Sequence, residues 1–115
     1  MAELHPLVAF HVGDTWEIAG TCNSANGPPI NLAGATVEWI LEDAAGNIVF
    51  NFSLSSGIAV ISAATGEILI TVTPSQSQSV APGRCKDSLR VTDSGGIVST
   101  QWVGFIDVRQ SLFTS

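Results

Sequence analysis

The sequence is poor in positive charge. Only four of its 115 residues are Lys or Arg, against ten Asp or Glu, and the formal net charge is −6 at pH 7. Proteins that bind nucleic acids or anionic membranes need clustered Lys and Arg side chains to displace counterions from phosphates. We therefore expect neither a nucleic acid nor a membrane among the partners of this chain.

Long apolar runs and a targeting segment are also missing. No stretch approaches the ~20 apolar residues of a membrane-spanning helix. Met1–Phe10 has neither a positive charge nor the apolar run of a signal peptide. We therefore expect no secretion by a signal peptide, and a protein that stays in the cytoplasm unless it leaves within a larger assembly.

Residues that would carry catalysis or bind a metal are few and scattered. The only His residues, His5 and His11, lie near the N-terminus, where a lone His is more often a surface or strand residue than a catalyst. The spacing His11-x-x-Asp14 offers two metal ligands where a site needs three or four. No calcium-loop pattern and no glycine-rich phosphate loop occurs. The sequence thus predicts no enzyme, no metal and no cofactor.

What the sequence does contain is an alternation of apolar and polar residues with a period of two, which indicates β-strands with one buried face. The alternation is clearest in residues 15–22, 36–42, 47–54 and 67–73. Asp43–Gly46 and Asp93–Gly96 predict tight hairpin turns between such segments. Short strands separated by turns predict one all-β domain over residues 1–115. We expect an immunoglobulin-like antiparallel β-sandwich of about 7–9 strands.

The same alternation assigns side chains to faces. It predicts that the three Trp residues, Trp16, Trp39 and Trp102, point into the core. It also places Ile48 and Val98 on the inward faces of their strands. A single helical turn is expected near residues 74–79, where Thr73 can cap it and Pro74 can take its first position.

Charge predicts one strand pairing. Arg84, Lys86 and Arg90 share one face of their strand, while Glu38 and Glu42 share the outer face of another. In an immunoglobulin topology these two strands are neighbours, so the opposite charges would face each other. Asp87 does not fit this pattern, because it lies on the inward face. Its carboxylate must either reach solvent near the end of the strand or bond a buried partner.

Two cysteines, Cys22 and Cys85, flank Trp39 with a spacing close to that of antibody domains. Cys22 comes at the end of its predicted strand, whereas Cys85 follows Pro82-Gly83 at the start of another. Those two strands run in the same direction in an immunoglobulin sandwich, so the sulfur atoms would lie at opposite ends. We therefore expect two buried free thiols, with a disulfide as the alternative.

Four apolar residues stand on faces that the alternation assigns to solvent: Ile40, Leu69, Val103 and Phe105. We take them as candidate interface residues, with Ile40, Val103 and Phe105 as an exposed patch. The alternative is that the first strand or the C-terminal segment, residues 109–115, covers them.

Five segments carry a resemblance to a known family. They are Gly13–Trp16, Gly27–Val37, Gly66–Thr71, Pro82–Cys85 and Leu89–Asp93. In this order they resemble small immunoglobulin-like domains of tailed phages and prophages. Among such domains, they are similar to the baseplate upper protein N-terminal domain and to related tail or fibre modules. The likeness covers about residues 13–108, and Cys85 stands where these domains usually have Tyr.

The resemblance implies a non-enzymatic structural protein of a phage or prophage virion, as a tail, neck, baseplate or fibre component. Such a protein would act by protein–protein assembly, with copies of itself or with other virion proteins, in the cytoplasm of a bacterial host. No functional residues carry over, because the family has no catalytic motif. The alternative is a carbohydrate- or ligand-binding module, which would need Trp16 or Trp102 to point outward. The alternation places both inside.

Overall fold

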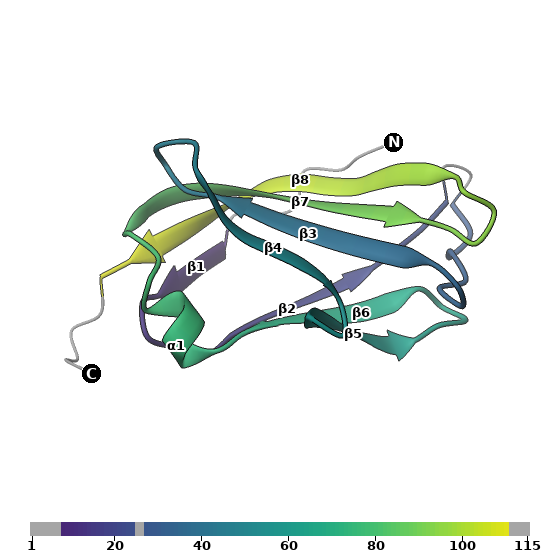
Figure 1. Ribbon diagram of the computed structural model, residues 1–115, viewed down its shortest axis with the longest axis horizontal. Coiled ribbons are helices and arrows are strands. Elements are labelled where there is room, and N and C mark those ends of the chain that lie inside the picture. Colours follow the sequence, from purple (N-terminus) through teal and green to yellow (C-terminus); the bar gives the residue numbers. More distant parts are fainter. Residues whose placement is uncertain (1–7, 25–26, 111–115) are drawn as a thin grey trace.

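The computed structural model describes residues 8–24 and 27–110. It contains eight strands and one helical turn (Figure 1). In chain order these are β1 (Val8–His11), β2 (Trp16–Thr21), β3 (Thr36–Glu42), β4 (Ile48–Leu54), β5 (Gly57–Ser62), β6 (Glu67–Val72), α1 (Pro74–Ser77), β7 (Gly83–Thr92) and β8 (Val98–Arg109).

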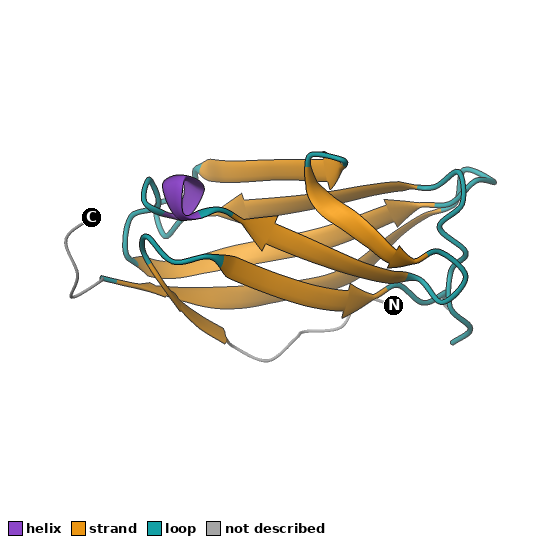
Figure 2. Cartoon of the chain, turned by 90° about the horizontal axis from the view of Figure 1, so that it is seen from below, coloured by secondary structure: helices purple, strands orange, loops and turns teal. Residues whose placement is uncertain are grey.

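The strands form two packed layers. Their hydrogen-bonded order is β1-β8-β7-β3-β4-β5-β6-β2. The chain turns from one layer to the other between β4 and β5, which pair only at Ser53–Gly57 and Leu54–Ile58. Strands β1, β8, β7, β3 and β4 therefore form one layer, and β5, β6 and β2 form the other (Figures 1 and 2). The sandwich predicted from the alternation is confirmed.

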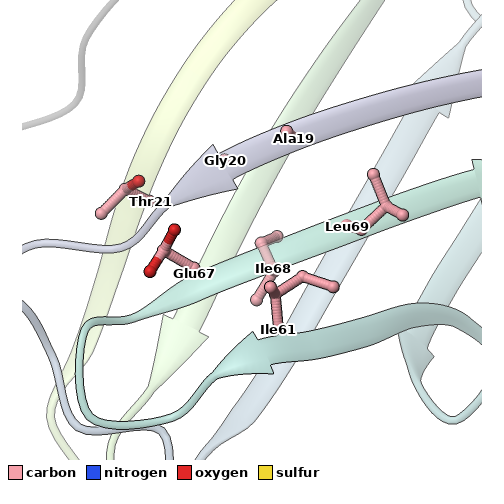
Figure 3. A pocket seen from close by; sticks show the side chains of 7 residues that line it. All are labelled: Ala19, Gly20, Thr21, Ile61, Glu67, Ile68 and Leu69. Atoms are coloured by element: carbon pink, nitrogen blue, oxygen red, sulfur yellow. The ribbon is translucent and has the colours of Figure 1, made fainter.

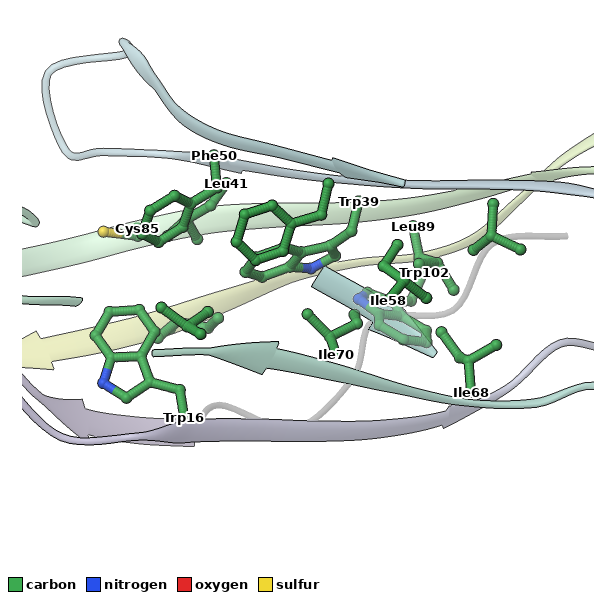
Figure 4. Close-up of a cluster of buried hydrophobic side chains, with 14 of the residues drawn as sticks. Trp16, Trp39, Leu41, Phe50, Ile58, Ile68, Ile70, Cys85, Leu89 and Trp102 are labelled. Atoms are coloured by element: carbon green, nitrogen blue, oxygen red, sulfur yellow. The ribbon is translucent and has the colours of Figure 1, made fainter. Parts of the chain in front are cut away.

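Aromatic rings fill the space between the layers. The largest fully buried side chains include Trp16, Trp39, Leu41, Ile68, Ile70 and Leu89 (Figure 4). Ile106 is fully buried as well. The Phe50 ring lies between the two layers, 6.3 Å from the ring of Trp39 and 6.4 Å from that of Trp16. Trp102 is 8% exposed. All three Trp side chains thus point inward, as the alternation predicts.

Two β-bulges overturn two of the predicted faces. In the β3–β4 ladder the register shifts after Leu41, so that Ile48 pairs with Glu42 on the outer side and is 61% exposed. A second shift, in the β7–β8 ladder, leaves Val98 paired with Thr92 and 57% exposed. A bulge adds one residue to one strand, so the side chains beyond it change faces. The prediction that Ile48 and Val98 face inward is therefore wrong.

The predicted helical turn is confirmed. The Thr73 hydroxyl accepts a hydrogen bond from the Gln76 amide, and the Gln76 side chain accepts one from the Thr73 amide, while Pro74 occupies the first turn. This reciprocal cap satisfies amides that the helix itself cannot pair. Ser77 is fully buried, and its hydroxyl donates to the Asp14 carbonyl over 2.7 Å. That bond fastens α1 to the β1–β2 turn.

Both cysteines are free and fully buried, as predicted. Cys22 follows the end of β2, and Cys85 lies near the start of β7. Burial raises the pKa of the Cys22 thiol to about 11. Burial, followed by the negative charges of Asp43 and Asp107, raises the pKa of Cys85. Since the thiolate is the reactive form, both side chains behave as small apolar core residues at neutral pH.

Candidate interaction surfaces

The outer side of β3, β7 and β8, centred on Ile40, Val103 and Phe105, is here called the front face. Ile40 pairs with Ser88, and Ser88 pairs with Val103, so the three form one row across the sheet. Phe105 lies two positions further along β8, opposite Lys86. The ladder thus brings together three of the four candidate interface residues, each of them partly exposed.

Charged side chains surround this apolar centre. The Arg84 guanidinium lies 5.9 Å from the centroid of the Phe105 ring and 3.2 Å from a carboxylate oxygen of Asp107. Arg90 and Glu38 form a second ion pair, at 2.8 Å. The predicted pairing of the basic strand with the Glu38 strand is therefore confirmed. Exposed pairs of this kind contribute only about 0.2–1 kcal/mol each.

The first strand and the C-terminal segment were the two candidates to cover the patch, and the structure tests the first strand. Strand β1 pairs edge to edge with β8, from Val8–Ile106 to His11–Arg109, so it extends this layer instead of lying over its outer side. Residues 111–115, the rest of the proposed cover, lie outside the described residues.

Leu69, the fourth candidate, lies on the opposite side of the sandwich. The outer side of β5, β6 and β2, centred on Leu69, is here called the back face. Leu69 pairs with Ala59 on one side and with Ala19 on the other, which gives a short row of small and apolar side chains. The structure therefore divides the four candidate residues between two faces.

A shallow depression of about 330 Å³ opens on the back face (Figure 3). Its lining residues are Ala19, Gly20, Thr21, Ile61, Glu67, Ile68 and Leu69. Ile61 is 61% exposed and Glu67 is exposed. Ile61 was not among the residues singled out from the sequence. The sequence signal was the run Ile58–Ile61, in which apolar and polar residues do not alternate. In the structure, a bulge leaves Ile61 outside the β5–β6 ladder.

Asp87 lies in the core and is 1% exposed. Its Oδ2 atom accepts hydrogen bonds from Nε1 of Trp39 over 2.9 Å and from Nε1 of Trp102 over 2.8 Å. Figure 4 shows the two indole nitrogens turned toward each other. Of the two outcomes that the sequence left open, the buried partner is the one found. An indole N–H can only donate, and the Asp87 side chain supplies the acceptor for both rings.

The described part of the chain shows no built metal site. Within residues 8–24 and 27–110, no three His, Cys, Asp or Glu side chains come together in a group that could hold a metal ion. His11 and Asp14 are exposed at the β1–β2 turn, where the Asp14 amide donates to the His11 carbonyl. His5 lies outside the described residues. Among the elements described, no helix is long and apolar enough to cross a membrane.

Comparisons with known proteins bear on the fold. The sequence matches no protein-family model and no curated protein. CopC from Methylosinus trichosporium OB3b is 16% identical, with a TM-score of 0.50 over 92% of this chain and 90% of CopC. The fibronectin(III)-like modules of Clostridium thermocellum CbhA are 13% identical, with a TM-score of 0.50 over 93% of each chain.

The fold is an immunoglobulin- and fibronectin-III-like β-sandwich. This confirms the fold class predicted from the sequence. At 13–16% identity the likeness shows the fold alone, and such sandwiches serve many functions. Neither likeness concerns a phage protein, so function has to be argued from the surfaces.

Proposed function

We propose that this chain is a non-enzymatic assembly module of a phage or prophage virion, as a tail, neck, baseplate or fibre component. It acts by protein–protein contact through the front face, first of all with copies of itself. The assignment to a virion is supported by the order of the five sequence segments that resemble phage and prophage domains. The assignment to assembly is supported by the front face.

The observation that carries the proposal is the apolar row of the front face inside a charged border. Ile40 and Val103 flank Ser88 at the centre, and Phe105 lies beneath the Arg84 guanidinium. Protein interfaces combine an apolar centre with a polar rim, and aromatic and Arg side chains are enriched in them. The domain measures 45 × 23 × 20 Å, so its broad side has room for the ~800 Å² that a specific interface buries on each partner.

The geometry disfavours the ligand-binding alternative. A carbohydrate-binding platform needs exposed aromatic rings, and Trp16 and Trp102 are 0% and 8% exposed. Asp87 holds the Trp102 indole in the core, so turning this ring outward would leave a buried carboxylate with one hydrogen bond fewer.

The test is the solution mass of the protein by size-exclusion chromatography with light scattering over a concentration series. We expect a defined oligomer for the wild type and a monomer for Phe105→Ser. Ile97→Ser is the matched control, because Ile97 is 68% exposed and lies beside the β7–β8 turn, away from Phe105. A wild type that is monomeric at every concentration would contradict self-assembly, and the partner would then be another protein or a glycan.

A further inference from the structure

The two outer faces of the sandwich differ in charge. All four Lys and Arg residues of the sequence lie on β7 and β8: Arg84, Lys86, Arg90 and Arg109. The three on β7 alternate along the strand and are exposed, as is Arg109 at the end of β8. The back-face strands carry no cation. Their charged residues are Glu17 on β2 and Glu67 on β6, and both are exposed.

Apolar groups are present on both faces. Ile40, Val103 and Phe105 lie on the front face, and Leu69 lies between two Ala residues on the back face, next to the exposed Ile61. Each face therefore has an apolar centre. The front face has cations together with the carboxylates of Glu38, Glu42 and Asp107, whereas the back face is purely acidic. This combination suits a contact in which the front face of one copy binds the back face of another.

We propose that copies of this chain assemble head to tail, with the front face of one copy binding the back face of the next. The proposal rests on the assembly function proposed above and specifies its geometry. A head-to-tail contact uses two different surfaces of each copy, so it generates a ring where the rotation closes and a filament where it does not.

Charge argues against a back-to-back arrangement, because it would oppose Glu17 and Glu67 with the same carboxylates and would supply no cation. Like charges brought together across an interface are costly. A front-to-front contact would join two faces on which Arg84 and Arg90 already pair with Asp107 and Glu38, and it would leave the back-face carboxylates without a cation. Front-to-back contact instead places cations against carboxylates and apolar centre against apolar centre.

The depression on the back face offers a specific site for this contact (Figure 3). Its wall is apolar at Leu69 and Ile61, and Glu67 adds a carboxylate. On the front face, the Arg84 guanidinium lies over the aromatic ring of Phe105. The Phe105 ring can pack against the apolar wall of the depression, and the Arg84 guanidinium can form an ion pair with the Glu67 carboxylate.

The test uses two variants, each with one face changed. The front-face variant carries Ile40→Ser and Phe105→Ser, and the back-face variant carries Ile61→Ser and Leu69→Ser. Head-to-tail assembly predicts that each variant alone is a 12.0 kDa monomer. An equimolar mixture forms a dimer of twice that mass, because each variant supplies the face that the other lacks. Light scattering measures the masses, and thermal melts show that both variants fold.

The remaining outcomes separate this inference from the proposed function. A back-face variant that still forms oligomers alone would overturn head-to-tail assembly while self-assembly stands. A front-face variant that still forms them would do the same and would exclude the front face as the contact. A mixture that stays monomeric would overturn the head-to-tail pairing. A monomeric wild type would overturn head-to-tail assembly and self-assembly together.

Discussion

The β3–β7–β8 sheet has a buried carboxylate on its inner side and exposed ion pairs on its outer side. Inside, one carboxylate, that of Asp87, is 1% exposed and accepts two indole N–H bonds. Outside, Arg84–Asp107 and Arg90–Glu38 are ion pairs in contact with solvent. A buried polar group is costly to disturb because it loses its partners without regaining water. Exposed pairs rearrange at little cost.

This contrast shows which side can serve a partner. The inner network links β3, β7 and β8 through buried hydrogen bonds, so the loss of one of its members lowers the stability of the domain. The outer pairs leave the front face free to exchange its partners for those of a second molecule. Mutations on the inner side should therefore appear in stability, and mutations on the outer side in assembly.

Removal of an inner ring should have the largest effect on stability. Trp39 is fully buried between layers and donates to Asp87. We expect Trp39→Ala to lower the free energy of unfolding by about 3–5 kcal/mol, since it removes a large buried aromatic side chain. Urea denaturation measures the loss. A cooperative transition with wild-type stability would show that Trp39 does not hold the core together.

The inner carboxylate should come next. Asp87→Ala leaves the indole N–H groups of Trp39 and Trp102 without their acceptor, and we expect a loss of about 2–4 kcal/mol. Asp87→Asn is the control. Both indoles donate to the same oxygen atom, so one amide oxygen can replace it, and the loss should be smaller. Equal stability of the Ala variant and the wild type would contradict the network.

The buried thiol should produce an effect confined to alkaline pH. The pKa of Cys22 rises from 9.0 to about 11 on folding, so the folded chain keeps a proton that the unfolded chain loses. The stability contributed by the neutral thiol is complete below pH 9 and falls as the pH rises from 9 to about 11. Cys22→Ala should flatten this decline in urea denaturation series. An equally steep decline in the variant would exclude Cys22 as its source.

The outer ion pairs should have the smallest effect on stability. Arg90→Ala removes the 2.8 Å contact with Glu38, and we expect a loss of at most about 1 kcal/mol. A double-mutant cycle with Glu38→Ala isolates the pair. A coupling energy well above that value would show that the outer ion pairs contribute to the free energy of unfolding as much as the inner network does.

Much of the fold could be predicted from the sequence because its signals are local. The period-two alternation assigned Trp16, Trp39 and Trp102 to the core, and the Thr73-Pro74 pair marked the start of α1. Ile48 was misplaced because a bulge adds a residue without altering the local pattern.

The surfaces were harder to predict because they depend on contacts between distant segments. Alternation placed Ile40 and Leu69 on outer faces, but only the folding of the chain at β4–β5 puts them on opposite sides of the sandwich. The inward position of Asp87 was readable from the sequence. Its two Trp partners depend on how three strands pack, which no local pattern encodes.

The most direct test of the account is the solution mass of the wild type beside Phe105→Ser, measured over one concentration series together with their melting curves. We predict that the wild type reaches a defined oligomer, while the variant stays at 12.0 kDa and melts within a few degrees of the wild type under conditions where both are monomeric. Equal masses of the two proteins at every concentration would contradict the claim that the front face is where this domain assembles.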